Sequence, residues 1–342
     1  MARKLSMSAA INEAMKLAMR KDENVILMGE DVAGGAEVDH LMDEDAWGGV
    51  LGVTKGLVQE FGRERILDTP ITEAGYMGAA MAAASTGLRP IAELMFNDFI
   101  GSCLDEVLNQ GAKFRYMFGG KAQVPVTIRT MHGAGFRAAA QHSQSLYALF
   151  TAIPGVKVVV PSTPYEAKGL LLAAIEDNDP VIFFEDKTLY NVEGEVPEDY
   201  YTIPLGKAEI KRVGEDVTIV AIGKQVQTAL DAAETLAAKG IEVEIVDPRS
   251  LSPLDEESIL ASVKKTNRLI VIDEANPRCS IATDIAALVA DKGFDYLDAP
   301  IKRITAPHTP VPFSPPLEDI YLPSPDRVVK VVSELIDSPI EV

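Results

Sequence analysis

Cysteine and positive charge are both scarce in this chain, and each shortage argues against a class of protein. There are two cysteines, Cys103 and Cys279, far apart in apolar or loop contexts. We therefore expect reduced thiols rather than a disulfide framework. The formal net charge is −19, from 32 Lys and Arg against 51 Asp and Glu. This excess of acid argues against a nucleic acid or an anionic membrane as the partner.

Long apolar runs are also missing. No stretch approaches the roughly 18–20 apolar residues that a membrane-spanning helix needs, and the N-terminal residues lack the apolar core of a signal peptide. The hydrophobic content of 47% and the charged content of 24% are typical of a soluble globular protein. With 342 residues, the chain is long enough for two domains. We expect a cytoplasmic protein.

Several common functional motifs are absent too. No G-x-G-x-x-G follows a strand, no G-x-x-x-x-G-K-[ST] occurs, and no histidines and cysteines have zinc spacing. The nearest fragment, Gly75 to Gly78, precedes small helical residues and is better interpreted as close packing. These absences argue against nucleotide binding through a standard phosphate loop and against a zinc site.

Short apolar strands alternate with helices of 3.6-residue spacing in two series. The first series begins with a helix at Ser8–Arg20 and ends with a strand at Val181–Phe184. Residues 191–206, with two prolines and no sustained period, predict a linker. The alternation predicts an α/β fold of two tandem parallel-sheet domains, at residues 1–190 and 207–342.

One loop in the first series is unusually long. Residues Ala33–Val53 carry two Gly-Gly pairs and the acidic cluster Asp39–Asp45, which includes His40. Loops of this length in a compact domain are usually functional or disordered. For the acidic cluster itself, a solvent-facing loop is the simplest interpretation.

Glu73 is a lone acid between an apolar strand, Arg65–Asp68, and an almost purely apolar helix. Burying a carboxylate costs several kcal/mol unless something compensates it, so an acid at this junction indicates a function. A helix cap is the alternative, because an acid in the first turn favours the helix dipole. Position alone leaves both open.

His142 is the histidine with the most suggestive position. It follows a glycine- and alanine-rich loop that leaves the carboxyl end of the predicted strand Val124–Arg129, and Glu73 also follows a strand. Ligands bind at the carboxyl ends of the strands in open parallel sheets. An acid and a histidine in one such crevice are suited to proton transfer.

The run Asp68–Glu73, DTPITE, resembles the signature of the beta subunits of thiamine-diphosphate-dependent 2-oxo acid dehydrogenases. The similarity continues along nearly the whole chain, through Gly87–Ile91, Ala140–Gln144, Pro154–Val158, Ala167–Leu170 and Pro204–Ala208. The resemblance implies a thiamine-diphosphate pyrimidine-binding domain followed by a transketolase C-terminal-like domain.

The resemblance also implies roles for particular residues. Glu73 would hydrogen-bond N1′ of the cofactor's aminopyrimidine and thereby promote loss of the thiazolium C2 proton, while Ile71, Met95 and Phe99 would line the pyrimidine pocket. His142 would handle protons, or position the lipoyl group, during reductive acyl transfer. Some family members have glutamine where this chain has Ser102, so a cofactor contact from that position is not implied.

The family's magnesium-diphosphate motif, Gly-Asp-Gly with a downstream asparagine, does not occur in this chain. The resemblance therefore implies an alpha subunit that supplies the Mg²⁺ site in an α2β2 assembly containing a second beta subunit, and a lipoyl-bearing dihydrolipoamide acetyltransferase core. It also implies a potassium site. A turn that binds no ion is an equally good interpretation of the same residues. The matching residues are Val126, Ala174, Ile175, Asp177 and Asp179.

The long segment Gly34–Leu57 and the run Leu94–Phe99 most resemble the acetoin dehydrogenase branch of the family. This predicts cleavage of acetoin to acetaldehyde, with the acetyl group passed to the lipoyl-bearing acetyltransferase. Pyruvate dehydrogenase and branched-chain 2-oxo acid dehydrogenase are the alternatives within the family. A non-catalytic scaffold subunit is the alternative of another class, and loss of Glu73 or His142 would have favoured it; both are present.

Overall fold

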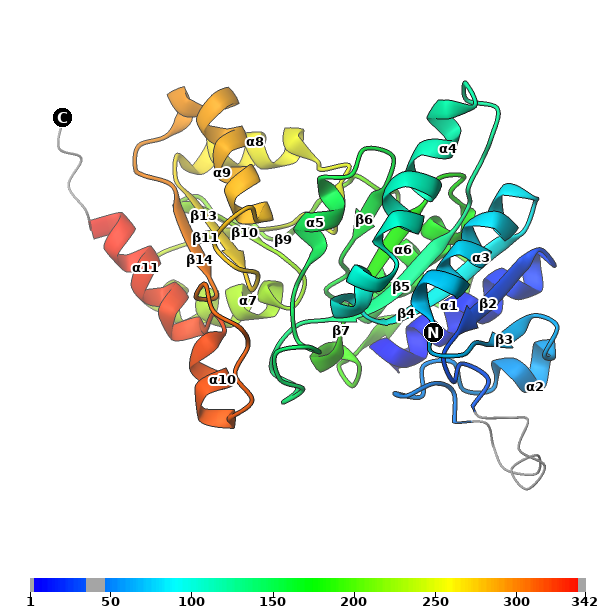
Figure 1. Cartoon of the computed structure of the whole chain (residues 1–342). Coiled ribbons are helices and arrows are strands. Elements are labelled where there is room, and N and C mark those ends of the chain that lie inside the picture. Colours follow the sequence, from blue (N-terminus) through cyan, green and yellow to red (C-terminus); the bar gives the residue numbers. More distant parts are fainter. Residues whose placement is uncertain (1–2, 35–46, 338–342) are drawn as a thin grey trace. The chain divides into compact units, whose positions relative to one another are not determined.

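The computed structural model describes residues 3–34 and 47–337 (Figure 1). The chain forms two compact units. The first runs up to His132 and resumes over Leu149–Leu205, and the second comprises Gly133–Ala148 and the chain from Gly206 onward. The predicted α/β fold with two tandem domains is confirmed. The predicted domain limits did not anticipate that Gly133–Ala148 groups with the second unit.

The first unit is built on a parallel sheet, in which neighbouring strands have the order β6-β7-β5-β4-β2-β3. Most residues of these strands are buried, including Leu27, Ile91 and Ile182, as expected where helices cover both faces. The strands are β2 (Val25–Gly29), β3 (Ile66–Asp68), β4 (Arg89–Phe96), β5 (Thr127–His132), β6 (Lys157–Val159) and β7 (Val181–Asp186).

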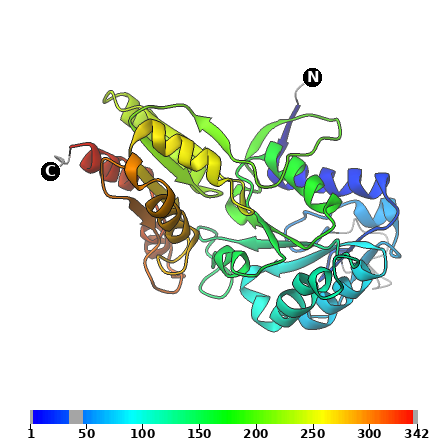
Figure 2. The same ribbon diagram turned by 90° about the horizontal axis from the view of Figure 1, so that it is seen from above.

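Helices lie on both faces of this sheet. Figure 2 shows α1 on one face, and α3 and α4 on the other. The apolar stripe of α1, with Ile11, Met15 and Met19, packs with α6 in one core. The helices are α1 (Met7–Lys21), α2 (Leu57–Phe61), α3 (Glu73–Ser85), α4 (Ala112–Met117), α5 (Tyr147–Thr151) and α6 (Pro164–Glu176), with a short 3₁₀ turn η4 (Lys187–Leu189).

Two regions of the first unit differ from the prediction. The residue pattern of the sequence predicts one helix over Asp98–Gly111. The structure instead has a 3₁₀ turn, η2 (Asn97–Ser102), then a π-helix, η3 (Glu106–Gly111), leading into α4. Buried Asn97 donates to the carbonyl of Met131 at 3.2 Å, a long-range tie that helical periodicity does not reveal. The predicted linker contains β8 (Glu193–Val196), which pairs antiparallel with β1 (Arg3–Ser6).

The acidic cluster Asp39–Asp45, with His40, lies outside the described residues. The residues on either side of the undescribed part of that loop are bonded to each other, because the hydroxyl of Thr54 donates to the carbonyl of Val32 at 2.7 Å. Gly48 has φ of +80°, and a side-chain carbon there would lie 2.1 Å from the backbone nitrogen of Lys55. Only glycine fits so close an approach.

The second unit has a sheet of order β14-β13-β10-β11-β9, parallel except for the edge strand β9. Its strands are β9 (Glu209–Arg212), β10 (Val217–Ala221), β11 (Val243–Asp247), β13 (Leu269–Asp273) and β14 (Lys302–Thr305), and the short β12 (Ser250–Ser252) also belongs to this unit. Its helices are α7 (Gln225–Ala237), α8 (Glu256–Thr266), α9 (Ile281–Lys292), α10 (Pro315–Tyr321) and α11 (Pro325–Asp337), with a 3₁₀ turn η5 (Phe294–Tyr296).

The apolar faces of α7 and α11 pack together against alternate residues of this sheet, including Ile219, Ile245 and Ile272. In the described part of the chain, no helix is long and apolar enough to cross a membrane. Cys103 is buried and Cys279 is exposed, and both are free thiols.

Candidate functional site

Two carboxylates follow strands at the carboxyl edge of the first unit's sheet. Glu30 comes directly after β2, and Glu73 begins α3 a few residues after β3. The side chain of Glu30 is buried, and one of its carboxylate oxygens has no hydrogen-bond partner among the described residues. Burial raises the pKa of Glu30, and the charge of Glu73 raises it further. The carboxyl edge is therefore a site of concentrated, poorly compensated negative charge.

Tyr76 adds a third polar group to this edge. It lies one turn along α3 from Glu73, its ring is buried, and its hydroxyl has no hydrogen-bond partner in the described residues. Burial raises the pKa of Tyr76, and the charges of Glu30 and Glu73 contribute to the same shift. Buried polar atoms without partners are uncommon, and they point to a ligand, an ion or a water.

Glu73 itself is half-buried, and its carboxylate has hydrogen-bonding capacity left over. The hydroxyl oxygen of Ser102 lies 3.1 Å from a carboxylate oxygen of Glu73 and 2.8 Å from the carbonyl oxygen of Phe99. A hydroxyl has a single proton to donate, so it satisfies one of these acceptors at a time. Glu73 thus keeps hydrogen-bonding capacity for another molecule. The helix-cap alternative stays open, because Glu73 lies in the first turn of α3, where an acid favours the helix dipole, and Thr72 makes no side-chain cap bond.

The apolar residues predicted around Glu73 have different environments. Ile71 is 83% exposed, an unusual state for a large apolar side chain next to a candidate site. Met95 is half-buried and packs against the main core of the unit. Phe99 is also half-buried, and its ring meets that of Phe96 edge-on with centroids 5.5 Å apart. Ser102 links Phe99 to Glu73.

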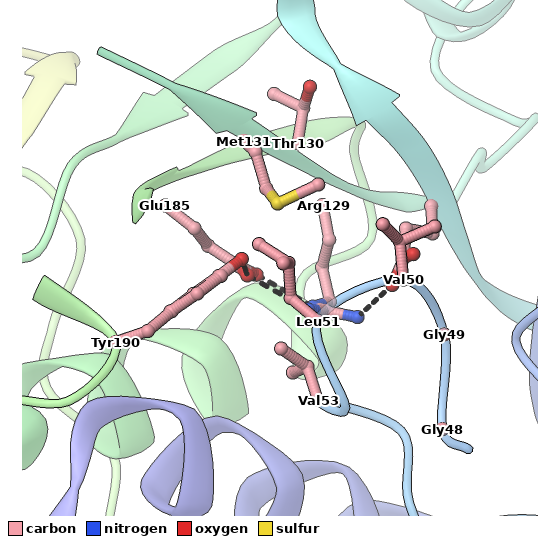
Figure 3. A pocket seen from close by; sticks show the side chains of 11 residues that line it. Gly48, Gly49, Val50, Leu51, Val53, Arg129, Thr130, Met131, Glu185 and Tyr190 are labelled. Atoms are coloured by element: carbon pink, nitrogen blue, oxygen red, sulfur yellow. Dashed lines mark hydrogen bonds and ion pairs between the residues drawn. The ribbon is translucent and has the colours of Figure 1, made fainter. Parts of the chain in front are cut away.

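Behind this edge, a buried charge cluster joins three strands. Arg129 on β5 donates twice to Glu185 on β7, at 2.7 and 2.8 Å, and once to Glu93 on β4, at 2.8 Å. The hydroxyl of Tyr190 donates to Glu185 at 2.6 Å. Figure 3 shows Arg129, Glu185 and Tyr190 with the loop residues Val50 and Leu51 beside them.

One guanidinium in this cluster serves two carboxylates, so negative charge is in excess. Burial raises the pKa of Glu93 despite its contact with Arg129. The adjoining cavity has a volume of about 10 Å³, enough for about one water molecule. Among the described residues, this cluster therefore supports the sheet, and the cavity beside it has room for a water rather than a substrate.

His142 lies half-buried in the segment Gly133–Ala148, which belongs to the second unit. Its backbone nitrogen donates to the carbonyl of Ala139 at 3.4 Å. Because Glu73 belongs to the first unit, the predicted meeting of the two residues in one crevice stays a prediction.

The five residues predicted to hold potassium gather where α6 ends and β7 begins. The carbonyl oxygens of Ile175 and Asp177 accept from Arg89 at 3.1 and 3.0 Å, and the carboxylate of Asp177 pairs with Lys157 at 2.5 Å. The carbonyl of Val126 accepts a hydrogen bond from the backbone nitrogen of Val181. The carbonyl of Ala174 accepts one from the backbone nitrogen of Asp177. The carboxylate of Asp179 forms an ion pair with Arg115. A carbonyl oxygen has two lone pairs, so each retains room for a second partner.

Comparison with known families identifies the architecture that carries this site. Residues 3–193 match the family described as "Transketolase, pyrimidine binding domain", and residues 206–328 match "Transketolase, C-terminal domain". This chain belongs to the transketolase family.

The relatives of this chain named below align with it over nearly their whole length. The chain is 81% identical, over 99% of both chains, to "Acetoin:2,6-dichlorophenolindophenol oxidoreductase subunit beta" of Bacillus subtilis. It is 62% identical to the protein of the same name from Cupriavidus necator, over 96% of both chains. The "Pyruvate dehydrogenase E1 component subunit beta" of Bacillus subtilis is more distant, at 42% identity over 97% of this chain and 99% of the relative.

A solved structure titled "Split gene transketolase, inactive beta4 tetramer" has the same fold. It superimposes with a TM-score of 0.75 over 97% of this chain and 98% of its own, at 21% identity. At this identity the likeness extends to the transketolase fold alone.

Sequence reasoning missed Glu30, Tyr76 and the Arg129 cluster. The signal for Glu30 was available, since it follows a strand as Glu73 does. Arg129 could have been noticed as the one Lys, Arg, Asp or Glu residue in the strand Thr127–His132. Tyr76 lies within the fragment Gly75 to Gly78 noted in the sequence, but its burial near two acids depends on how α3 packs.

Proposed function

We propose that this chain is the β subunit of a thiamine-diphosphate-dependent acetoin dehydrogenase. The enzyme would cleave acetoin, release acetaldehyde and pass the acetyl group to a lipoyl-bearing acetyltransferase. The observation that carries the proposal is the gap in identity: 81% and 62% to relatives named for acetoin, against 42% to relatives named for 2-oxoisovalerate and for pyruvate in Bacillus subtilis.

The residues at the carboxyl edge fit a bound aminopyrimidine. Glu73 has unused hydrogen-bonding capacity, and polar atoms of Glu30 and Tyr76 without partners among the described residues lie near its charge. The hydroxyl of Ser102 lies within hydrogen-bond distance of both Glu73 and the carbonyl of Phe99, so the apolar ring of Phe99 belongs to the same neighbourhood. Thiamine diphosphate, when bound, supplies an acidic carbon and an electron sink for cleaving the bond next to a carbonyl.

Glu73 would hold a hydrogen bond to N1′ of the aminopyrimidine. Ile71, Met95 and Phe99 would exclude water from that bond and strengthen it, because electrostatic interactions grow as the local dielectric falls. His142 would hold or move a proton, or orient the lipoyl group, during acyl transfer.

The rest of the cofactor requires a partner. The Gly-Asp-Gly motif is missing from the sequence, and the relatives' names specify a subunit beta. An alpha subunit would therefore supply the Mg²⁺ and diphosphate site. We propose an α2β2 heterotetramer with a second beta subunit, located in the cytoplasm and docked on an acetyltransferase core.

Assembly of the chain with its alpha subunit tests the function directly. We expect dye reduction with acetoin to exceed that with pyruvate or with a branched-chain 2-oxo acid. Turnover of pyruvate alone would contradict the acetoin assignment.

Substitution of Glu73→Gln in the same assembly is expected to lower turnover by at least about a hundredfold, since electrostatic contributions of this kind are worth 10²–10³. Glu64→Gln, at an exposed acid outside the site, is the matched control. Unchanged turnover in Glu73→Gln would remove this residue from the mechanism and favour a non-catalytic scaffold.

We also propose that the turn of Val126, Ala174, Ile175, Asp177 and Asp179 binds potassium through its carbonyl oxygens. The convergence of these residues and their remaining lone pairs support the proposal. The assembled enzyme should then melt at a higher temperature in potassium chloride than in tetramethylammonium chloride of equal ionic strength. Equal melting temperatures would favour a turn without an ion.

A further inference from the structure

The segment Gly133–Ala148, here called the histidine segment because it carries His142, has an unusual backbone. Gly133, Gly135, Arg137 and Ala139 all have positive φ, at 92°, 101°, 61° and 62°. For arginine and alanine the left-handed region is disfavoured, because Cβ crowds the backbone. Such a conformation persists only where surrounding structure imposes it. The shape of this segment therefore depends on contacts outside it.

Glu318 on α10 makes such contacts near the start of the segment. Its side chain is completely buried. Its carboxylate accepts from the backbone nitrogens of Gly135 and Arg137, at 2.7 and 3.2 Å, and from the guanidinium of Arg137 at 2.7 Å. All three donors belong to Gly135 and Arg137, which both have positive φ, so the carboxylate holds the turn in its strained form.

A second anchor holds the end of the segment at the carboxyl end of β13. Ser145 donates to Glu274 at 2.6 Å, and buried Tyr147 donates to Asp273. Asp273 is fully buried and also accepts from the backbone nitrogen of Ala275 at 2.9 Å. His142 lies between the two anchors, three residues before Ser145 and five after Arg137.

We infer that Glu318 is a positioning residue for His142. This inference rests on the proposed role of His142 in acyl transfer. The carboxylate of Glu318 sets the path of the histidine segment and so places the imidazole where the acyl group is handed on. Displacing a catalytic group by about 1 Å can cost about a hundredfold in rate, so a loosened anchor has a measurable effect.

Glu318→Gln is the sharpest variant because it preserves the volume of the side chain. Glutamine has one acceptor oxygen instead of two and directs an NH₂ group at donors. It cannot serve Gly135 and Arg137 together as the carboxylate does. Asp319→Asn is the matched control, since Asp319 is a neighbour on the same helix, pairs with the same Arg137 and has a 64% exposed side chain.

The experiment uses the complex of this chain with its alpha subunit and measures acetyl transfer to a lipoyl domain. Glu318→Gln is expected to lower kcat for this transfer about ten- to a hundredfold, whereas Asp319→Asn stays within about twofold, as expected for an exposed ion pair. Hydrogen exchange should be faster at residues 135–137 in Glu318→Gln only. Equal rates in Glu318→Gln and wild type would overturn the inference.

A double mutant separates positioning from a general structural effect. If Glu318 acts through His142, adding Glu318→Gln to His142→Asn causes no further loss, because coupled residues are not additive. An additional loss of the same size would overturn the positioning role and leave the role of His142 intact. A normal transfer rate in His142→Asn alone would overturn the proposed role of His142 and with it the inference.

Should Glu318→Gln fail to assemble, Arg137→Gln tests the same contact from the other side. It removes the guanidinium from Glu318 while the backbone bonds of Gly135 and Arg137 remain. We expect Arg137→Gln to lower the rate of acetyl transfer less than Glu318→Gln does. In the His142→Asn background, Arg137→Gln should cause no further loss. Full transfer activity in Arg137→Gln would count against the anchor.

Discussion

At the scale of single residues, the most consequential feature is the poorly compensated charge around Glu30. Its carboxyl is buried, one oxygen lacks a partner among the described residues, and the charge of Glu73 acts on it. A buried carboxylate without such compensation destabilises the folded state. That cost is tolerated where a group serves a function, and strained or unsatisfied groups concentrate at such sites.

Glu30→Gln should reveal this cost as a pH-dependent gain in stability. The folded-state pKa of Glu30 is raised above its unfolded value, so the folded state binds the proton more tightly. Stability is therefore lost as pH rises through the interval between the two values, and the loss is complete above the folded-state pKa. The variant cannot ionise and escapes the loss.

The measurement is thermal melting of the purified chain across pH. We expect Glu30→Gln to melt above wild type at neutral pH, and the difference to vanish below about pH 4, the ordinary carboxyl range. Glu64→Gln, at an exposed acid, should follow wild type throughout. A constant difference at every pH would mean that ionisation of Glu30 is not the cause.

At the scale of elements, the charge cluster of Arg129 ties three strands of the first sheet together. Arg129 on β5 lies between Glu93 on β4 and Glu185 on β7, and all three are strand residues. A buried ion pair adds little net stability compared with an apolar replacement of all partners. Removal of one partner is different, because it leaves the others charged and buried.

Arg129→Met is therefore expected to destabilise the chain by about 3–5 kcal/mol, since Glu93 and Glu185 lose their shared cation. Arg20→Met is the control, because its pair with Glu60 is exposed and should be worth less than about 1 kcal/mol. Chemical denaturation measures both. Similar losses in the two variants would show that burial does not set the energy of the Arg129 cluster.

At the scale of the whole molecule, the proposed alpha subunit would complete a cofactor site that this chain holds only in part. The residues proposed to hold the pyrimidine lie in this chain, whereas the diphosphate motif is missing from its sequence. We therefore expect the isolated chain to bind thiamine diphosphate and Mg²⁺ weakly or not at all in calorimetry, and the complex with the alpha subunit to bind it tightly. Tight binding to the isolated chain would contradict the shared site.

The sequence by itself determined most of the strands and helices, the two mostly parallel sheets and the family, because local periodicity and short motifs depend on neighbouring residues. Glu73 and His142 stood out for the same reason. Only the tertiary structure decided that Glu30 and Tyr76 lie within reach of the charge of Glu73, and that the histidine segment folds with the second unit. The bond of Arg137 to Glu318 spans 181 residues. No local pattern encodes such a pairing, since it exists only once the chain has packed.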